Sequence, residues 1–132
     1  MIRRDFLQAE IEKLAQALAK IMGLKEAGKI QEADNLLDKT LDQSFDLDLE
    51  EIIKSNPDEL KTLLLAKNFP AEKLDLLNKF LLESVSPFQQ NPETKTVLNH
   101  VLIIYQVLEQ EHHTQSLENL DQQKTILQFL QQ

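Results

Sequence analysis

The sequence predicts an all-α protein of five to seven antiparallel helices. Apolar residues recur at spacings of three and four along most of the chain, as on the buried face of a helix. Only two glycines and four prolines occur in 132 residues, which leaves little material for the tight turns of a β-protein. A chain of this length is close to the usual size of one folded unit, so we expect a single domain over residues 1–132.

The first two predicted helices form a hairpin. One apolar stripe marks the first helix and consists of Leu7, Ile11, Leu14, Leu18 and Ile21. Three further residues widen it: Ala15, Ala19 and Met22. Gly28 is expected to end this helix, because glycine accepts the left-handed conformation that follows many helix ends. The second helix runs to about residue 44, with an apolar face of Ile30, Ala33, Leu37 and Leu41. The short connection predicts that the two helices pack antiparallel.

Start signals, more than length, predict two short helices between residues 45 and 66. Asp48 can cap the first, with Glu51 three residues later in a capping-box arrangement. Asn56 can cap the second, and Pro57 suits its first position, where a backbone donor is not needed. The residues expected to face inward are Leu60, Leu63 and Leu64.

A longer helix is predicted to begin at Pro70. Its apolar stripe consists of Leu74, Leu77, Leu81, Val85 and Phe88. Asn91 and Pro92 repeat the combination of a cap residue and a proline, and residues 97–108 are apolar around almost the whole circumference. Such a helix is expected at the centre of the fold.

Residues 101–105 could also form a buried strand, because a short apolar run does not fix the period. No turn residue interrupts residues 93–110, and no second convincing strand is present, so a helix is favoured. A final helix is expected to be capped near Ser116. Its inward residues are predicted to be Leu117, Leu120, Leu127 and Leu130.

Acidic residues are concentrated in one segment. The formal net charge is −8, and residues 31–59 hold ten of the 22 acidic side chains but two of the 14 basic ones. The rest of the chain is therefore balanced. A negative field repels phosphate backbones, and no basic stripe opposes it, so nucleic acid is not expected as a partner.

Asp34, Asp38 and Asp42 are spaced four apart, which places them on one ridge of the second helix. We interpret this ridge as a candidate docking surface for a basic protein partner, since charge guides encounter and orientation. The other interpretation, which is favoured for this ridge taken alone, is that it only keeps the protein in solution, because charged helix faces are common.

A carboxylate and two imidazoles occur together near residue 112. Glu109 and His112 have the Glu-x-x-His spacing that places both side chains on one helix face, and His113 follows. Di-iron bundles need this motif twice, with two further carboxylates, and here it occurs once. No metal or cofactor is therefore predicted. The favoured interpretation is a solvated helix end, where imidazolium complements the dipole. A metal- or small-ligand-binding bundle using Glu109 and His112 is the alternative.

Two further polar features have structural interpretations. His100 lies in the apolar helix and is expected to be a hydrogen-bonded core histidine. Residues 46–51 alternate acidic and apolar side chains like part of a calcium loop, but Glu51 stands where that loop needs glycine. Calcium is therefore not predicted.

The sequence contains no catalytic motif. No serine or threonine lies in a glycine-rich elbow, two glycines cannot build a phosphate loop, and cysteine is absent. We predict a non-enzymatic module that binds another protein or itself, a homodimer being one form. No apolar run approaches the roughly 18 residues of a membrane span, and the N-terminus lacks a signal-peptide pattern. We therefore expect a cytoplasmic protein with no membrane contact.

Residues 14–41 resemble a tetratricopeptide unit. Gly28 matches its turn glycine, Ala33 its small residue early in the second helix, and Leu41 a later apolar position. Two positions of the first helix depart from the repeat, Leu24 and Ile21, and no second copy follows at the period of about 34 residues. The resemblance implies tetratricopeptide-like hairpins. An irregular bundle is the other arrangement compatible with the helices.

Nearly the whole chain also resembles an uncharacterised bacterial family of short all-helical proteins, a domain of unknown function. The residues that carry this resemblance are Ile2-Arg3-Arg4-Asp5-Phe6, Ile11-Glu12-Lys13-Leu14-Ala15-Gln16-Ala17-Leu18-Ala19 and Ser116-Leu117-Glu118. The resemblance implies a bacterial origin and assigns no active-site residue.

Overall fold

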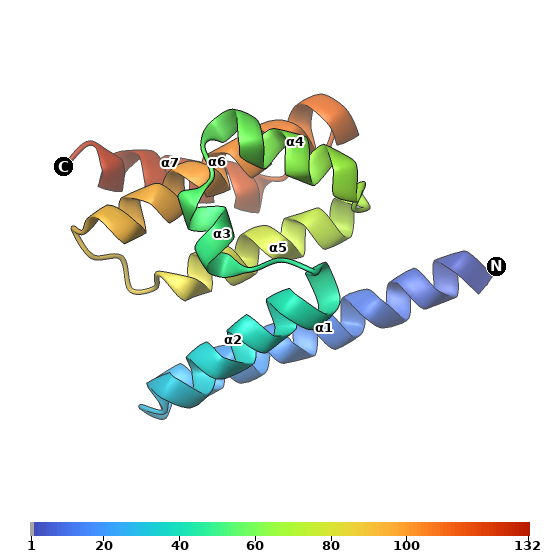
Figure 1. Ribbon diagram of the computed structural model, residues 1–132, viewed down its shortest axis with the longest axis horizontal. Helices are drawn as coiled ribbons and strands as arrows, with labels where there is room; N and C mark the ends of the chain where they lie inside the picture. Colours follow the sequence, from blue (N-terminus) through green and yellow to red (C-terminus); the bar gives the residue numbers. More distant parts are fainter. Residues whose placement is uncertain (1) are drawn as a thin grey trace. The chain divides into compact units, whose positions relative to one another are not determined.

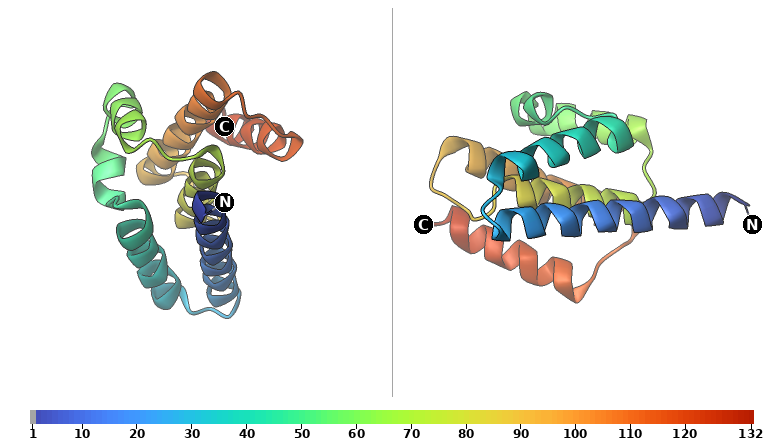
Figure 2. Two further views of the ribbon diagram at one scale, coloured as in Figure 1. Left: turned by 90° about the vertical axis from the view of Figure 1, so that its right-hand side faces the viewer. Right: turned by 90° about the horizontal axis from the view of Figure 1, so that it is seen from below.

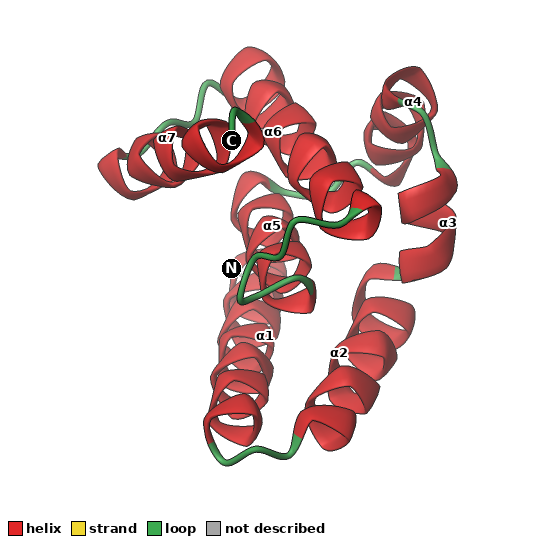
Figure 3. Cartoon of the chain, turned by 90° about the vertical axis from the view of Figure 1, so that its left-hand side faces the viewer, coloured by secondary structure: helices red, strands yellow, loops and turns green. Residues whose placement is uncertain are grey.

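The computed structural model describes residues 2–132, with side chains from residue 5 onward. Met1 and the side chains of Ile2, Arg3 and Arg4, part of the family resemblance, lie outside this description. The described residues form seven helices and no strand, which confirms the all-α prediction (Figure 3). Contacts divide the chain into two compact units, Met1–Lys54 and Ser55–Gln132. The expectation of a single domain stays a prediction.

The first unit is an antiparallel hairpin followed by one short helix. It contains α1 (Ile2–Glu26), α2 (Ile30–Phe45) and α3 (Leu49–Lys54), and Figure 1 shows α1 and α2 side by side in opposite directions. Gly28 adopts a left-handed conformation with φ of 79°, which confirms its predicted place at the turn. The largest buried side chains of the hairpin are Leu14, Ile21, Leu37, Leu41 and Phe45.

The widened stripe predicted for α1 is wrong. Leu14 and Ile21 are buried and the rest of the stripe is half-buried, but the three residues expected to widen it, Ala15, Ala19 and Met22, are exposed. Each follows a stripe residue by one position, which turns it about 100° around the helix and away from the buried face. On α2 the predicted inward position of Ile30 is also wrong. Ile30 is 51% exposed, because it is the first residue of the helix.

The second unit is built around one helix. It contains α4 (Pro57–Lys67), α5 (Ala71–Ser84), α6 (Pro92–His112) and α7 (Leu117–Leu130). Helix α6 packs along α5, and Figures 2 and 3 show it between α4 and α7. Ten of its residues are buried, so the prediction of a central helix is confirmed and the alternative strand is not formed.

Three predicted caps are confirmed in this unit. The Asn56 side chain accepts from the Glu59 amide at 2.8 Å, and the Glu59 carboxylate accepts from the Asn56 amide at 3.1 Å. Asn91 Oδ1 accepts from the Thr94 amide at 2.8 Å. Ser116 caps α7 in the same way. These bonds satisfy backbone donors that the first turn of a helix leaves without a partner, which is why helices begin directly after these residues.

Two predictions about apolar stripes are wrong in this unit. Phe88 lies beyond the end of α5, because the helix stops at Ser84 and Pro87 disfavours helical geometry at the preceding residue. Its ring packs edge-on against Phe129, with ring centroids 5.4 Å apart. The other error concerns the final helix. Three of the four leucines expected to face inward on α7 are exposed, namely Leu117, Leu120 and Leu127.

The described helices lack the features of a membrane-spanning segment. Among residues 2–132, none of the helices has the combined length and apolar character needed to cross a bilayer.

Candidate functional site

The acidic ridge is a real surface feature of α2. Asp34, Asp38 and Asp42 are all exposed, and the buried side of the same helix carries Ala33 and Leu37. The sequence pattern placed these three carboxylates correctly because α2 is strongly amphipathic. Their outward position follows from the burial of the opposite face.

Two further acidic residues, which sequence reasoning did not include, approach the ridge from α3. Helix α2 ends at Asp46, which adopts a left-handed conformation with φ of 53° and reverses the chain. The Asp48 side chain then accepts from the Glu50 amide at 2.9 Å, which helps to order the first turn of α3. A signal was present in the sequence, because an aspartate directly after an amphipathic helix can take the left-handed position that usually needs glycine.

Asp38 is where the acidic side chains converge. Partial burial is the largest cause that raises the pKa of its carboxyl above the ordinary value. Negative charge on three neighbours raises it further, and these neighbours are Asp34, Asp48 and Glu50. We call the five residues Asp34, Asp38, Asp42, Asp48 and Glu50 the acidic face. Within the described side chains, no member of the acidic face forms an ion pair.

The histidines near residue 112 lie where α6 ends. His113 is the cap residue, exposed and left-handed with φ of 52°, and Glu109 is exposed. His112 is half-buried and lines a pocket of about 150 Å³ together with Glu111. Glu109 does not line it, so the predicted Glu109–His112 pair does not share a site.

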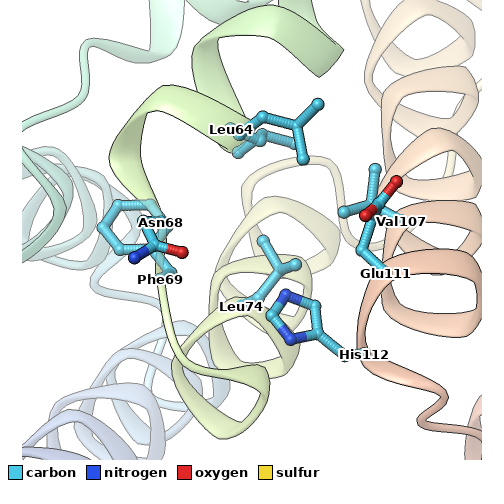
Figure 4. Close-up of a pocket in the computed structure, with 8 residues that line it drawn as sticks. Leu64, Asn68, Phe69, Leu74, Val107, Glu111 and His112 are labelled. Carbon is cyan, nitrogen blue, oxygen red and sulfur yellow. The ribbon is translucent and has the colours of Figure 1, made fainter.

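Residues from α4 and its end face residues of α6 across this pocket (Figure 4). The apolar residues that line it are Leu64, Leu65, Phe69, Leu74 and Val107, and the polar ones are Asn68, Glu111 and His112. A cavity of this size has room for about one small ring. No three His, Cys, Asp or Glu side chains gather in a way that could hold a metal ion within the described residues.

His100 has the structural role expected of it. Its side chain is 3% exposed, and Nε2 donates to the Ser55 carbonyl oxygen at 2.9 Å. This bond connects α6 to the start of α4 within the second unit. Burial lowers the pKa of His100, because the charged imidazole is poorly solvated there. Nδ1 has no hydrogen-bond partner among the described side chains and backbone groups.

A polar network joins α5 to α7. Asn119 is buried and its Nδ2 donates to Asp75 Oδ1 at 2.9 Å. Lys79 Nζ lies 3.7 Å from the carboxylates of both Asp75 and Glu118. Tyr105 lies close by, and burial, with the negative charges of this network, raises the pKa of its hydroxyl. The network holds α7 in a defined rotation against α5.

Comparison with protein-family models, curated proteins and solved structures found no match to this chain. The tetratricopeptide and bacterial-family resemblances therefore stay predictions. Function has to be argued from the side chains.

Proposed function

We propose that this chain is a non-catalytic protein-interaction module whose acidic face docks a basic partner. The observation that carries the proposal is that exposed carboxylates of α2 and of the start of α3 act electrostatically on Asp38, and that no member of the acidic face is paired with a described cation. Such charges repel one another in the free protein. A partner that brings lysine or arginine side chains relieves that repulsion as it binds, so the free energy lost locally in folding is recovered on association.

The free energy recovered in this way is modest. The charges mainly increase the rate at which the partner binds and set its orientation. Complementary charge steers the encounter of two proteins, and the effect weakens as salt shortens the range of the field. Affinity is expected to come from apolar contacts around the charged centre. Cysteine is absent from the sequence, which suits a reducing compartment, so we place the proposed interaction in the cytoplasm.

Charge reversal combined with partner capture tests the proposal. A variant with Asp34→Lys, Asp38→Lys and Asp48→Lys is used as bait for native lysate beside the wild-type chain, and captured proteins are identified by mass spectrometry. We expect the wild type to capture a basic protein that the variant loses. A matched control reverses three exposed carboxylates outside the acidic face: Glu12→Lys, Glu26→Lys and Glu109→Lys.

The control carries the same net charge as the first variant, so it separates a docking surface from a general loss of negative charge. Equal capture by all three proteins would remove the acidic face from the interaction. Equal loss from both variants would show that overall charge, and not this surface, attracts the partner.

We propose as a second candidate that the pocket at the end of α6 takes a small ligand or a metal ion. The observation that favours it is that Glu111 and His112 line one cavity, with Glu111 in place of the predicted Glu109. A metal-free sample is heated with excess Zn²⁺, Fe²⁺ or Mn²⁺, since a ligand at about 100 times its Kd adds about 2.7 kcal/mol to the free energy of unfolding. A melting temperature that is unchanged for wild type and for His112→Ala would dispose of the metal site.

A further inference from the structure

Helix α7 carries an apolar stripe that no described residue of the second unit covers. Leu117 is 82% exposed, Leu120 41% and Leu127 46%. The buried residues of the same helix, Asn119 and Ile126, each precede a stripe leucine by one position, which places them about 100° around the helix from it. Side chains of leucine are usually withdrawn from water, so a row of three on one short helix indicates a surface that meets another protein.

The spacing of the stripe is that of a coiled-coil seam. Steps of three and four lead from Leu117 to Leu120, Lys124, Leu127 and Gln131. These are alternating a and d positions of a heptad, with leucine at three of the five and Lys124 in the middle. A single lysine at such a position lowers stability but fixes the register and the number of helices that associate. The stripe is therefore suited to one neighbouring helix in one register.

We propose that α7 packs antiparallel against α7 of a second copy of this chain, about a twofold axis level with residue 122. In this register each Leu117 lies against the partner's Leu127, and each Leu120 lies against the aliphatic part of the partner's Lys124. The same patch on both copies makes the contact, as a twofold interface requires. The surface belongs to the second unit, whereas the acidic face belongs to the first.

Charge complementarity selects a second copy over an unrelated helix. Asp121 is exposed and occupies the e position beside the seam. In an antiparallel pair, the a and e positions of both helices lie on the same side of the interface. The antiparallel register thus places Lys124 of each copy one residue along the axis from Asp121 of the other, on the same side of the interface, so two opposite-charge pairs flank the axis. The partner's Asp121 is thus the counterion of Lys124, the one charged residue in the otherwise apolar part of the seam.

The interface is short, so the dimer is expected to be weak. Helix α7 has 14 residues, and at 1.5 Å per residue its axis is about 21 Å long. Stable protein interfaces bury more than about 1,000 Å², and a single pair of such helices lies toward the transient end of that range. Association should therefore be visible only when the protein concentration is varied.

Sedimentation equilibrium over a wide concentration range tests the proposal. The wild-type chain should move from the mass of one chain to that of two as concentration rises. Leu127→Glu should raise the dissociation constant at least about tenfold, because each dimer loses two buried leucines. Met22→Glu is the matched control, since Met22 is 45% exposed on α1, and it should dimerise like the wild type. Circular dichroism confirms that each variant remains helical.

Two further variants test the register itself. Asp121→Lys and Lys124→Asp should each weaken the dimer, and the double variant that carries both should restore it. Lys124→Leu should strengthen it, because a fourth leucine completes the seam. A wild-type chain and a Lys124→Leu variant that both stay monomeric at the highest concentration would overturn the proposal. So would a dimer that Leu127→Glu leaves intact, or a double variant no better than either single change.

Discussion

Removing one charge from the acidic face should make the protein more stable. Asp38→Asn keeps the size and shape of the side chain but deletes the charge on which Asp34, Asp48 and Glu50 converge. A like-charge pair four residues apart on a helix, such as Asp34 and Asp38, costs about 0.2–0.5 kcal/mol, and we take the same magnitude for Asp48 and Glu50. Three such neighbours give an expected gain of about 0.5–1.5 kcal/mol in the free energy of unfolding at pH 7.

The raised pKa of the Asp38 carboxyl explains why deleting its charge should increase the free energy of unfolding. The folded state holds this proton more tightly than the unfolded state does, so the unfavourable contribution is absent below the unfolded pKa of 3.8. It grows as pH rises through the higher folded pKa and is fully present at neutral pH. The advantage of Asp38→Asn over the wild type should therefore disappear in acid.

Urea denaturation measures the gain directly. At about 0.01 M salt the Debye length is about 30 Å, and at about 1 M it is about 3 Å, so the advantage should shrink at high salt. Asp42→Asn is the matched control on the same helix. Its charge is not among those that raise the pKa of Asp38, so its gain should be smaller. A variant Asp38→Asn that is no more stable than wild type, or whose gain is insensitive to salt, would refute the reasoning.

Three other predictions concern hydrogen bonds in the second unit. Asn56→Ala should lower the free energy of unfolding by about 1 kcal/mol in urea titrations, because it removes the cap bond to the Glu59 amide, while Asn56→Ser should lose much less. Equal stability of wild type and the alanine variant would contradict the cap. Asn78→Leu should raise the free energy of unfolding by about 1 kcal/mol. The buried Asn78 Oδ1 has no hydrogen-bond partner among the described groups, and removing this unpaired oxygen should stabilise the protein by more than the loss of the bond from Nδ2 to the Val101 carbonyl costs. A loss of more than about 2 kcal/mol would show that this amide is satisfied and needed. His100 has a lowered folded pKa, so its contribution to stability is fully present above the unfolded pKa of 6.5 and is lost as pH falls below it. Thermal melts should therefore show a smaller acid sensitivity for His100→Gln than for wild type, and identical pH profiles would contradict this.

Helix boundaries were predictable because local chemistry sets them. Asn56, Asn91 and Ser116 each satisfy a backbone amide in the first turn that follows, and this needs no knowledge of distant residues. Gly28 ends the hairpin turn for an equally local reason, its positive φ. The acidic ridge was predictable for the same reason, since the buried face of α2 is determined by its own sequence. Asp48 and Glu50 join it through the left-handed turn at Asp46, which the apolar pattern of α2 alone does not show.

Which face of a helix is buried depends more on residues far away in the sequence, as α7 shows. Four leucines in its sequence suggested an inward stripe, yet the buried residues are Asn119 and Ile126. Asn119 donates to Asp75 across the gap between α7 and α5, and turning the leucines inward would break that bond. A buried polar group that loses its partner costs about 1–3 kcal/mol, and the same rotation would also bring Ile126, which is fully buried, into solvent. The rotation that keeps the bond leaves three leucines in solvent, a cost that association of two α7 helices would offset. The error in the sequence prediction and the proposed dimer interface therefore have the same cause.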